Sequence, residues 1–184
     1  MGEYNEINDF KEVLFTKDQI DVMTKSMGEK ITEDFKEKDL VVIGLLKGSV
    51  VFLADLVREI KLSCELDFMA VSSYGNGTES LGRVQIIKDI SESVLGKDVL
   101  VVEDIVDSGI TLNFIVSHLK NKGAKSVTLC TLINKPERRK KPVDVKYIGA
   151  DIPNEFIAGY GMDYAEKYRN LPFIGVLKEE VYSK

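Results

Sequence analysis

Histidine and cysteine are scarce in this chain, which has one histidine, His118, and two cysteines, Cys64 and Cys130. No cysteine and histidine spacing typical of a zinc site is present, and no Ser-His-Asp arrangement is available, so His118 is expected to be structural. Two cysteines far apart in sequence are typical of buried thiols in a reducing compartment, with a disulfide or metal pair as the alternative. The cysteines therefore predict a cytoplasmic protein.

Long apolar runs and excess positive charge are also absent. No run reaches the ~18 apolar residues that can span a bilayer, and the polar, acidic segment 1–10 is unlike a signal or transit peptide. The net charge is −5 and the pI about 5.1, so we expect no nucleic-acid or membrane partner held by bulk charge. The 184 residues, 44% of them hydrophobic, contain no repeat or linker and predict one domain.

The most informative stretch is 99–112. It begins with a short apolar segment typical of a buried strand, Val99–Val102, which an acidic pair follows, Glu103 and Asp104. A small polar turn, Asp107 to Gly109, then leads to Thr111 at the start of an amphipathic helix. Free N–H groups at a helix start form an anion site. The stretch has no lysine and no Gly-x-x-x-x-Gly-Lys pattern, which excludes a triphosphate P-loop.

The same stretch indicates a sugar phosphate. Ser108 and Thr111 supply hydroxyl donors, and Gly109 lets the backbone approach a ligand closely. A short neutral cradle of this kind fits one phosphate, while the preceding carboxylates suit vicinal hydroxyls, which donate hydrogen bonds to anions. A phosphate beside a diol describes ribose 5-phosphate.

Residues 101–112 resemble the phosphoribosyl pyrophosphate signature of the type I phosphoribosyltransferases; the alternative is an acidic flavodoxin-like strand-loop-helix. Further matches run in order from Lys47 to Arg169, about two-thirds of the chain. The resemblance implies a catalytic, proton-handling Asp107. It also implies a ribose and phosphate site made of Glu103, Asp104, Asp107, Ser108, Gly109, Ile110 and Thr111. Ile110 departs from some relatives, which carry lysine there.

A second loop follows the predicted strand Leu40–Leu46. Lys47 and Gly48 resemble the pyrophosphate loop of the hypoxanthine-guanine branch, whose members often have a non-proline cis peptide at this place; the alternative is a solvated lysine in a turn. The resemblance adds Arg169 to the pyrophosphate site. It also implies a Mg2+ ion held by Glu103, Asp104 and Asp163, in part through water.

Three further residues match the purine-binding part of the family. Lys135 would donate to the oxygen at position 6 of the base, Phe156 would stack on the purine, and the Ile157 backbone would contact its pyrimidine edge. Without the resemblance, Phe156 is typical of an ordinary core aromatic. The basic run 138–141 is expected to be a solvated loop face, with a nucleic-acid patch as the alternative. Segment 72–82, opened by Ser73 and Tyr74, is expected to be the lid over the reaction centre.

The rest of the sequence predicts the helices and strands that surround these loops. A capping box at Thr16 predicts a helix that ends near Lys38. Helix 52–60 and strands 65–72, 83–89, 126–133, 143–150 and 173–177 are expected as well. The resemblance implies a doubly wound, mostly parallel α/β sheet with flanking helices as the core, about 38–150, and a small hood from 1–15 and 151–184.

As a member of this family, the chain is expected to transfer the 5-phosphoribosyl group from phosphoribosyl pyrophosphate to a purine base in purine salvage. Hypoxanthine and guanine would give the purine mononucleotides IMP and GMP, with pyrophosphate released. A homodimer or homotetramer is expected. Two alternatives stay open: an enzyme that prefers xanthine or uracil, and a regulator of the same fold that senses phosphoribosyl pyrophosphate or binds RNA.

Overall fold

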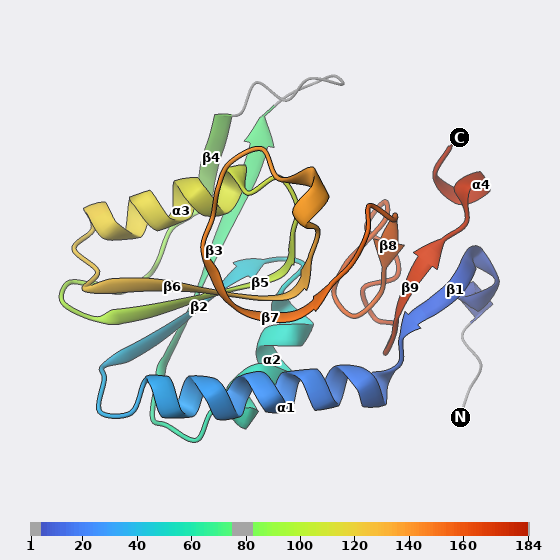
Figure 1. Ribbon diagram of the computed structural model, residues 1–184. Helices are drawn as coiled ribbons and strands as arrows, with labels where there is room; N and C mark the ends of the chain where they lie inside the picture. The colour runs from blue at the N-terminus through green and yellow to red at the C-terminus, as the bar shows by residue number, and fades with distance from the viewer. Residues whose placement is uncertain (1–4, 75–82, 184) are drawn as a thin grey trace.

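A six-stranded sheet forms the centre of the computed structural model, which describes residues 5–74 and 83–183 (Figure 1). Only β3 and β4 pair antiparallel; the other neighbours are parallel. In spatial order the strands are β4 (Arg83–Lys88), β3 (Glu65–Tyr74), β2 (Leu40–Leu46), β5 (Asp98–Val106), β6 (Ser126–Asn134) and β7 (Val145–Asp151). The expected mostly parallel α/β sheet is confirmed.

Helices cover both faces of this sheet, as in a doubly wound fold. Helices α1 (Lys17–Asp34) and α2 (Val50–Glu59) pack on one face, and α3 (Ile110–Asn121) packs on the other. The capping box at Thr16 is confirmed. The expected end of α1 near Lys38 is wrong, because the helix stops at Asp34 and Glu37 takes a left-handed backbone with φ 63°.

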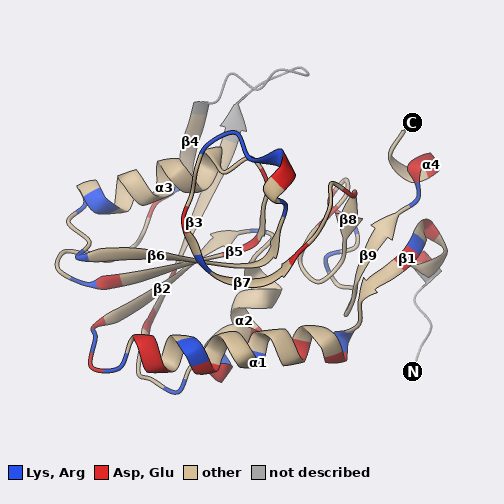
Figure 2. Ribbon diagram, in the orientation of Figure 1, with Lys and Arg blue, Asp and Glu red and all other residues tan. Residues whose placement is uncertain are grey.

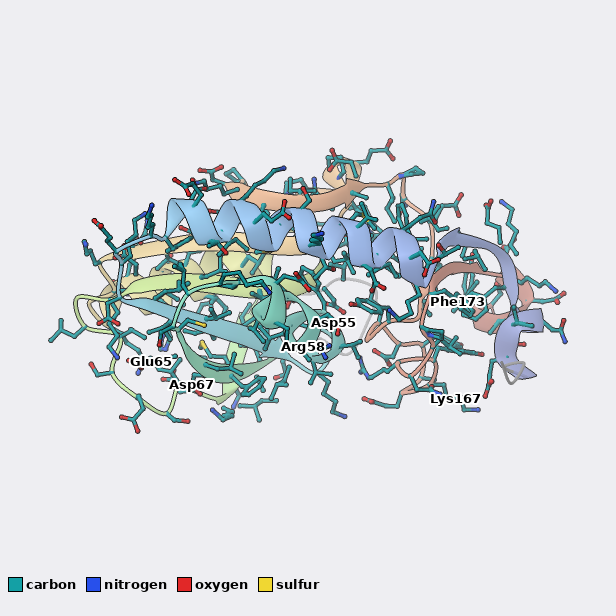
Figure 3. All side chains as sticks on the ribbon, turned by 90° about the horizontal axis from the view of Figure 1, so that it is seen from below. Asp55, Arg58, Glu65, Asp67, Lys167 and Phe173 are labelled. Atoms are coloured by element: carbon teal, nitrogen blue, oxygen red, sulfur yellow. The ribbon has the colours of Figure 1, made fainter. Side chains whose placement is uncertain are left out.

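The two ends of the chain form a second, three-stranded sheet in the order β1 (Phe10–Phe15), β9 (Ile174–Leu177) and β8 (Ile157–Ala158). It has its own small core, to which Phe10, Tyr168 and Phe173 contribute. Figure 3 shows Lys167 and Phe173 in this part, beyond one end of α1. Short helices η1 (Asn5–Asp9) and α4 (Glu179–Tyr182) flank the sheet, and η2 (Pro136–Arg138) follows β6.

Both cysteines are free thiols: Cys130 is buried in β6, and Cys64 is half-buried just before β3. Across residues 5–74 and 83–183, no helix combines the length and apolar character that crossing a membrane requires.

Candidate active site

Strand β5 is longer than the apolar run that predicts it. The strand continues through Val106, so the acidic pair Glu103 and Asp104 belongs to the strand and does not follow it. The extension follows from parallel pairing with β6, which continues from Glu103 opposite Thr131 to Val106 opposite Asn134. Because successive strand side chains alternate, the two carboxylates point to opposite faces of the sheet.

Asp104 is buried against the loop that follows β2. A Cβ atom on Gly48 would overlap Asp104 Oδ2, so any larger residue there would displace the Asp104 carboxyl. The Ile105 N–H donates to Asp104 Oδ1 over 3.0 Å, but burial outweighs this bond and raises the pKa of Asp104 to about 6. Burial, with Asp104 as a second anion, also raises the pKa of Glu103 well above its usual value. Glu103 Oε2 is buried and has no hydrogen-bond partner among the described residues.

The predicted phosphate loop lies between β5 and α3. Gly109 precedes α3 in a left-handed conformation, φ 75°, and Ser108 Oγ accepts from the Ile110 N–H over 3.3 Å. A cavity of about 100 Å³ opens here. Its lining includes Glu103, Asp107, Ser108, Gly109 and Thr111, whereas Ile110, whose N–H is bonded to Ser108 Oγ, is not part of the lining. The cavity has the size and the backbone donors that suit one phosphate group.

The basic loop after β6 lies against this phosphate loop (Figure 2). Arg138 Nε donates to Asp107 Oδ1 over 2.7 Å, and Arg139 donates to Asn134. The Ser108 carbonyl accepts from the backbone N–H groups of residues 140 and 141. Residues 138, 140 and 141 are exposed, as expected of a solvated loop face, but that expectation is wrong for Arg139, which is half-buried because Asn134 at the end of β6 engages it.

A second cavity, of about 210 Å³, lies beside the first and shares Ile105 with it. It brings together predicted site residues from β5, the position after β6, and the segment that surrounds β8: Asp104, Lys135, Phe156, Ile157 and Asp163, with Met162. Residues more than fifty positions apart therefore line one space.

Two of these residues have defined partners. Lys135 Nζ donates to the Glu155 carbonyl over 2.6 Å, and burial lowers the pKa of its ammonium group. Phe156 is 40% exposed and stacks on Tyr182 with ring centroids 4.5 Å apart. Phe156 is thus not a core aromatic, and its neighbour Tyr182 is a residue that no sequence motif singles out.

The predicted pyrophosphate residues also lie together. The Leu46–Lys47 peptide is cis, as in members of the branch that the sequence resembles. Arg169 lies 2.7 Å from Asp163 Oδ1 and donates to the Gly161 carbonyl over 2.8 Å. A Cβ atom on Gly161, where φ is 100°, would overlap the Gly48 carbonyl, so the turn from 159 to 169 packs directly on the loop after β2.

Ser73 and Tyr74, predicted to open a lid, end β3 and pair with Val84 and Arg83 of β4. The rest of the predicted lid, 75–82, lies outside the described residues.

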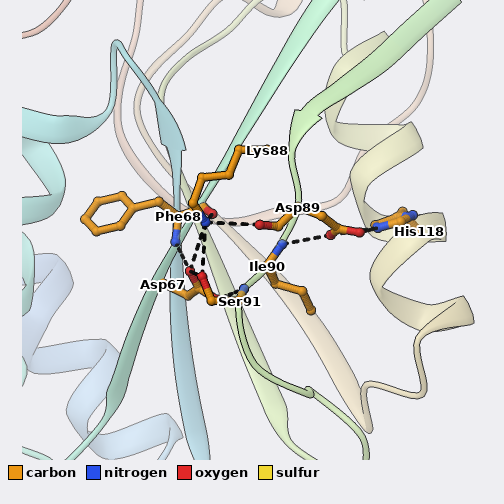
Figure 4. A network of polar contacts seen from close by, with 7 residues as sticks. All are labelled: Asp67, Phe68, Lys88, Asp89, Ile90, Ser91 and His118. Atoms are coloured by element: carbon orange, nitrogen blue, oxygen red, sulfur yellow. Dashed lines mark hydrogen bonds and ion pairs between the residues drawn. The ribbon is translucent and has the colours of Figure 1, made fainter.

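His118 lies in α3 away from both cavities, where its Nε2 is 3.0 Å from Asp89 Oδ1 (Figure 4). Lys88 joins the same network by donating to the carbonyl groups of Phe68 and Asp89. The contacts tie α3 to the edge of the sheet and agree with a structural role for His118.

Comparisons with known proteins agree with this arrangement. The family model described as phosphoribosyl transferase domain matches residues 16–165. A hypoxanthine-guanine phosphoribosyltransferase from Staphylococcus epidermidis is 52% identical over 96% of this chain and 98% of its own length. A crystal structure of a hypoxanthine phosphoribosyltransferase from Staphylococcus aureus has a TM-score of 0.95 and 49% identity, covering 99% of this chain and all of its own.

A more distant structure is similar along its whole length. A mutant hypoxanthine phosphoribosyltransferase from Trypanosoma cruzi, solved as a ternary substrates complex, has a TM-score of 0.90 and 37% identity, covering 95% of this chain and 99% of its own. The chain therefore belongs to the phosphoribosyltransferase family, and within it to the hypoxanthine-guanine branch.

Proposed function

We propose that this enzyme transfers the 5-phosphoribosyl group from phosphoribosyl pyrophosphate to hypoxanthine and guanine, giving IMP or GMP and pyrophosphate. The observation that carries the proposal is the pair of adjoining cavities, which share Ile105. One has backbone donors for a phosphate, and the other has a buried lysine and an exposed aromatic ring for a base. The names of the relatives support the same reaction.

The ribose lies between the two cavities in this proposal. Its 5-phosphate binds the N–H groups and hydroxyls of residues 108–111, and its vicinal hydroxyls donate to Glu103 and Asp104. The unpartnered Glu103 Oε2 supports this assignment, because a buried carboxylate oxygen without a donor is costly. The purine N9 attacks the anomeric carbon as pyrophosphate leaves, and the two carboxylates stabilise the positive charge that grows on the ribose ring.

The base binds in the larger cavity. Lys135 donates to the oxygen at position 6, Phe156 stacks on the ring, and the Ile157 backbone contacts the pyrimidine edge. Adenine carries an amino group, itself a donor, at the position that Lys135 faces, so it is rejected. Asp107 accepts the proton at purine N7. This role requires Arg138, now 2.7 Å from Asp107, to release or share that carboxylate.

Pyrophosphate binds Lys47, the Gly48 backbone and Arg169. A Mg2+ ion would fit beside it, because Asp104 is a buried carboxylate, the half-buried Glu103 has an unpartnered oxygen, and Asp163 lines the same cavity as Asp104. No group of three or more possible ligands converges in the described residues. When bound, Mg2+ neutralises charge on the departing pyrophosphate.

We propose that the three-stranded sheet covers the base as a hood, and that Ser73 and Tyr74 open the lid that excludes water during transfer. We further propose a cytoplasmic homodimer or homotetramer with no nucleic-acid or membrane partner.

Steady-state turnover with phosphoribosyl pyrophosphate and each of hypoxanthine, guanine, xanthine and uracil tests the proposal. Hypoxanthine and guanine are expected to give the highest kcat/KM. A higher kcat/KM with xanthine or uracil would instead identify the enzyme as a phosphoribosyltransferase that prefers that base. If none of the four bases is turned over but the protein binds phosphoribosyl pyrophosphate or labelled messenger RNA, the result would support a non-catalytic regulator of the same fold.

A further inference from the structure

The two cations assigned to pyrophosphate share one carboxylate partner. Glu166 Oε2 lies 3.1 Å from Lys47 Nζ and 3.3 Å from Arg169 Nη2. Lys47 follows β2, whereas the other two residues belong to the turn before β9, so a single carboxylate oxygen bridges two distant parts of the chain. A negative charge of the protein itself therefore engages the cations proposed to bind the leaving group.

The backbone holds Glu166 at the tip of a tight turn. Ala165 and Glu166 have φ values of 51° and 63°, and Tyr164 and Lys167 exchange backbone hydrogen bonds on either side. Two central residues with positive φ define a type I′ turn. The Glu166 N–H also donates to Asp163 Oδ2 over 2.9 Å. The main chain at Glu166 is thus fixed by several contacts.

The side chain of Glu166, in contrast, can move away from Lys47 and Arg169. It is 65% exposed, so its carboxylate can rotate into water without a desolvation cost. Hydrogen bonds from Lys47 and then Arg169 lower the pKa of Glu166, which keeps it ionised. When Glu166 leaves, Arg169 retains Asp163 at 2.7 Å and the Gly161 carbonyl at 2.8 Å. Arg169 therefore stays in position while its Nη2 loses one of its two carboxylate partners.

We propose that Glu166 is an internal counter-anion that holds Lys47 and Arg169 until the pyrophosphate group displaces it and that competes with pyrophosphate for them. This inference rests on the proposed function, because it takes these cations to be the pyrophosphate site. Its consequence is weaker binding of pyrophosphate-bearing ligands than the cations alone would give, and faster release of the product pyrophosphate.

Calorimetric titration with sodium pyrophosphate, in EDTA and separately with excess Mg2+, tests the proposal on wild type and three variants. Glu166→Gln removes the charge and keeps the shape, and Glu166→Gly removes the side chain at a positive φ that glycine accepts. Glu180→Gln, an exposed carboxylate in α4, is the matched control. Both Glu166 variants are expected to bind pyrophosphate about 3- to 10-fold tighter in both buffers, since exposed ion pairs are individually weak.

Glu180→Gln is expected to bind pyrophosphate like wild type. Unchanged or weaker binding in both Glu166 variants would overturn the proposal and assign Glu166 to positioning the cations. Tighter binding only with Mg2+ would overturn it too, because direct competition needs no metal. Turnover of the wild-type enzyme, measured in parallel, separates this inference from the proposed function. If the wild type is active but the Glu166 variants bind pyrophosphate no tighter, this inference alone is refuted. If the wild type neither turns over nor binds pyrophosphate, both the inference and the proposed function are refuted.

Discussion

Gly48 and Asp104 lie in contact although 56 positions separate them, and a Cβ atom on Gly48 would overlap Asp104 Oδ2. The contact joins the loop after β2 to the end of β5, so the residues assigned to pyrophosphate and to ribose are positioned by one another. A displacement at either residue is therefore expected to disturb both sites.

Gly48→Ala tests this coupling. We expect kcat/KM for phosphoribosyl pyrophosphate to fall about 100-fold, since displacing a reacting group by about 1 Å costs that much. Gly96→Ala is the control, because a Cβ there meets nothing within 4 Å, and its φ of 76°, which Gly48 does not share, makes it the more strained backbone position for alanine. Equal kinetics in the two variants would show that the contact between Gly48 and Asp104 does not position the site.

Lys135→Ala is expected to reduce the preference for hypoxanthine over adenine at least tenfold, measured as the ratio of kcat/KM values. The reason is that the buried ammonium group discriminates a carbonyl acceptor from an amino donor. Lys120→Ala, at an exposed position of α3, controls for the loss of one positive charge. An unchanged ratio in Lys135→Ala would remove this residue from the base site.

The stacked pair Phe156 and Tyr182, with ring planes 15° apart, predicts an effect of the C-terminal segment on base binding. Tyr182→Ala is expected to raise the KM for hypoxanthine about 3- to 10-fold with a smaller change in kcat, because an aromatic pair is worth about 0.5–1.5 kcal/mol. Tyr182→Phe keeps the ring and should behave like wild type. Similar losses in both variants would contradict a role for stacking.

Asp98, at the opposite end of β5, predicts a pH dependence of stability. Burial alone raises the pKa of its carboxyl, but a hydrogen bond from Ser126 over 2.6 Å and the Lys125 ion pair at 3.3 Å bring the pKa below its ordinary value. A lowered folded pKa means that the ionised form stabilises the protein above the unfolded value of 3.8 and that this contribution is lost as pH falls through the folded value.

Asp98→Asn is therefore expected to lower the free energy of unfolding by about 1–3 kcal/mol at pH 7, with the gap to wild type closing below about pH 4. Urea denaturation from pH 7 to pH 3 measures it, with Asp144→Asn, an exposed site, as the control. A gap that stays constant with pH would rule out ionisation of Asp98 as its cause.

Local pattern predicts most of the central sheet. Strand Leu40–Leu46 is apolar throughout because helices cover both of its faces, and its predicted bounds are those observed. Strands β1 and β8 carry no such signal: β1 has three exposed residues in six, and β8 is two residues long. Both strands pair with β9, which lies between them. Pairing between segments so far apart in the sequence cannot be predicted from a short stretch of residues.

The candidate site likewise contains residues whose position the sequence predicts and residues whose position it does not. Asp107, Lys47 and Lys135 follow buried strands, so their position at the carboxyl edge of the sheet is predictable from the chain order. Glu166, Tyr182 and Arg138 lie in segments that are typical of a turn, a tail and a charge run. Their partners are 119, 26 and 31 positions away, and only the folded arrangement makes those pairings visible.

A crystal structure with bound inosine monophosphate tests the proposed phosphate and base sites most directly. Under this proposal, we expect phosphoryl oxygens within hydrogen-bond distance of the N–H groups of residues 108–111, with the base in the neighbouring cavity between Lys135 and Phe156. A nucleotide bound elsewhere, with the cavity beside Gly109 left empty, would contradict it.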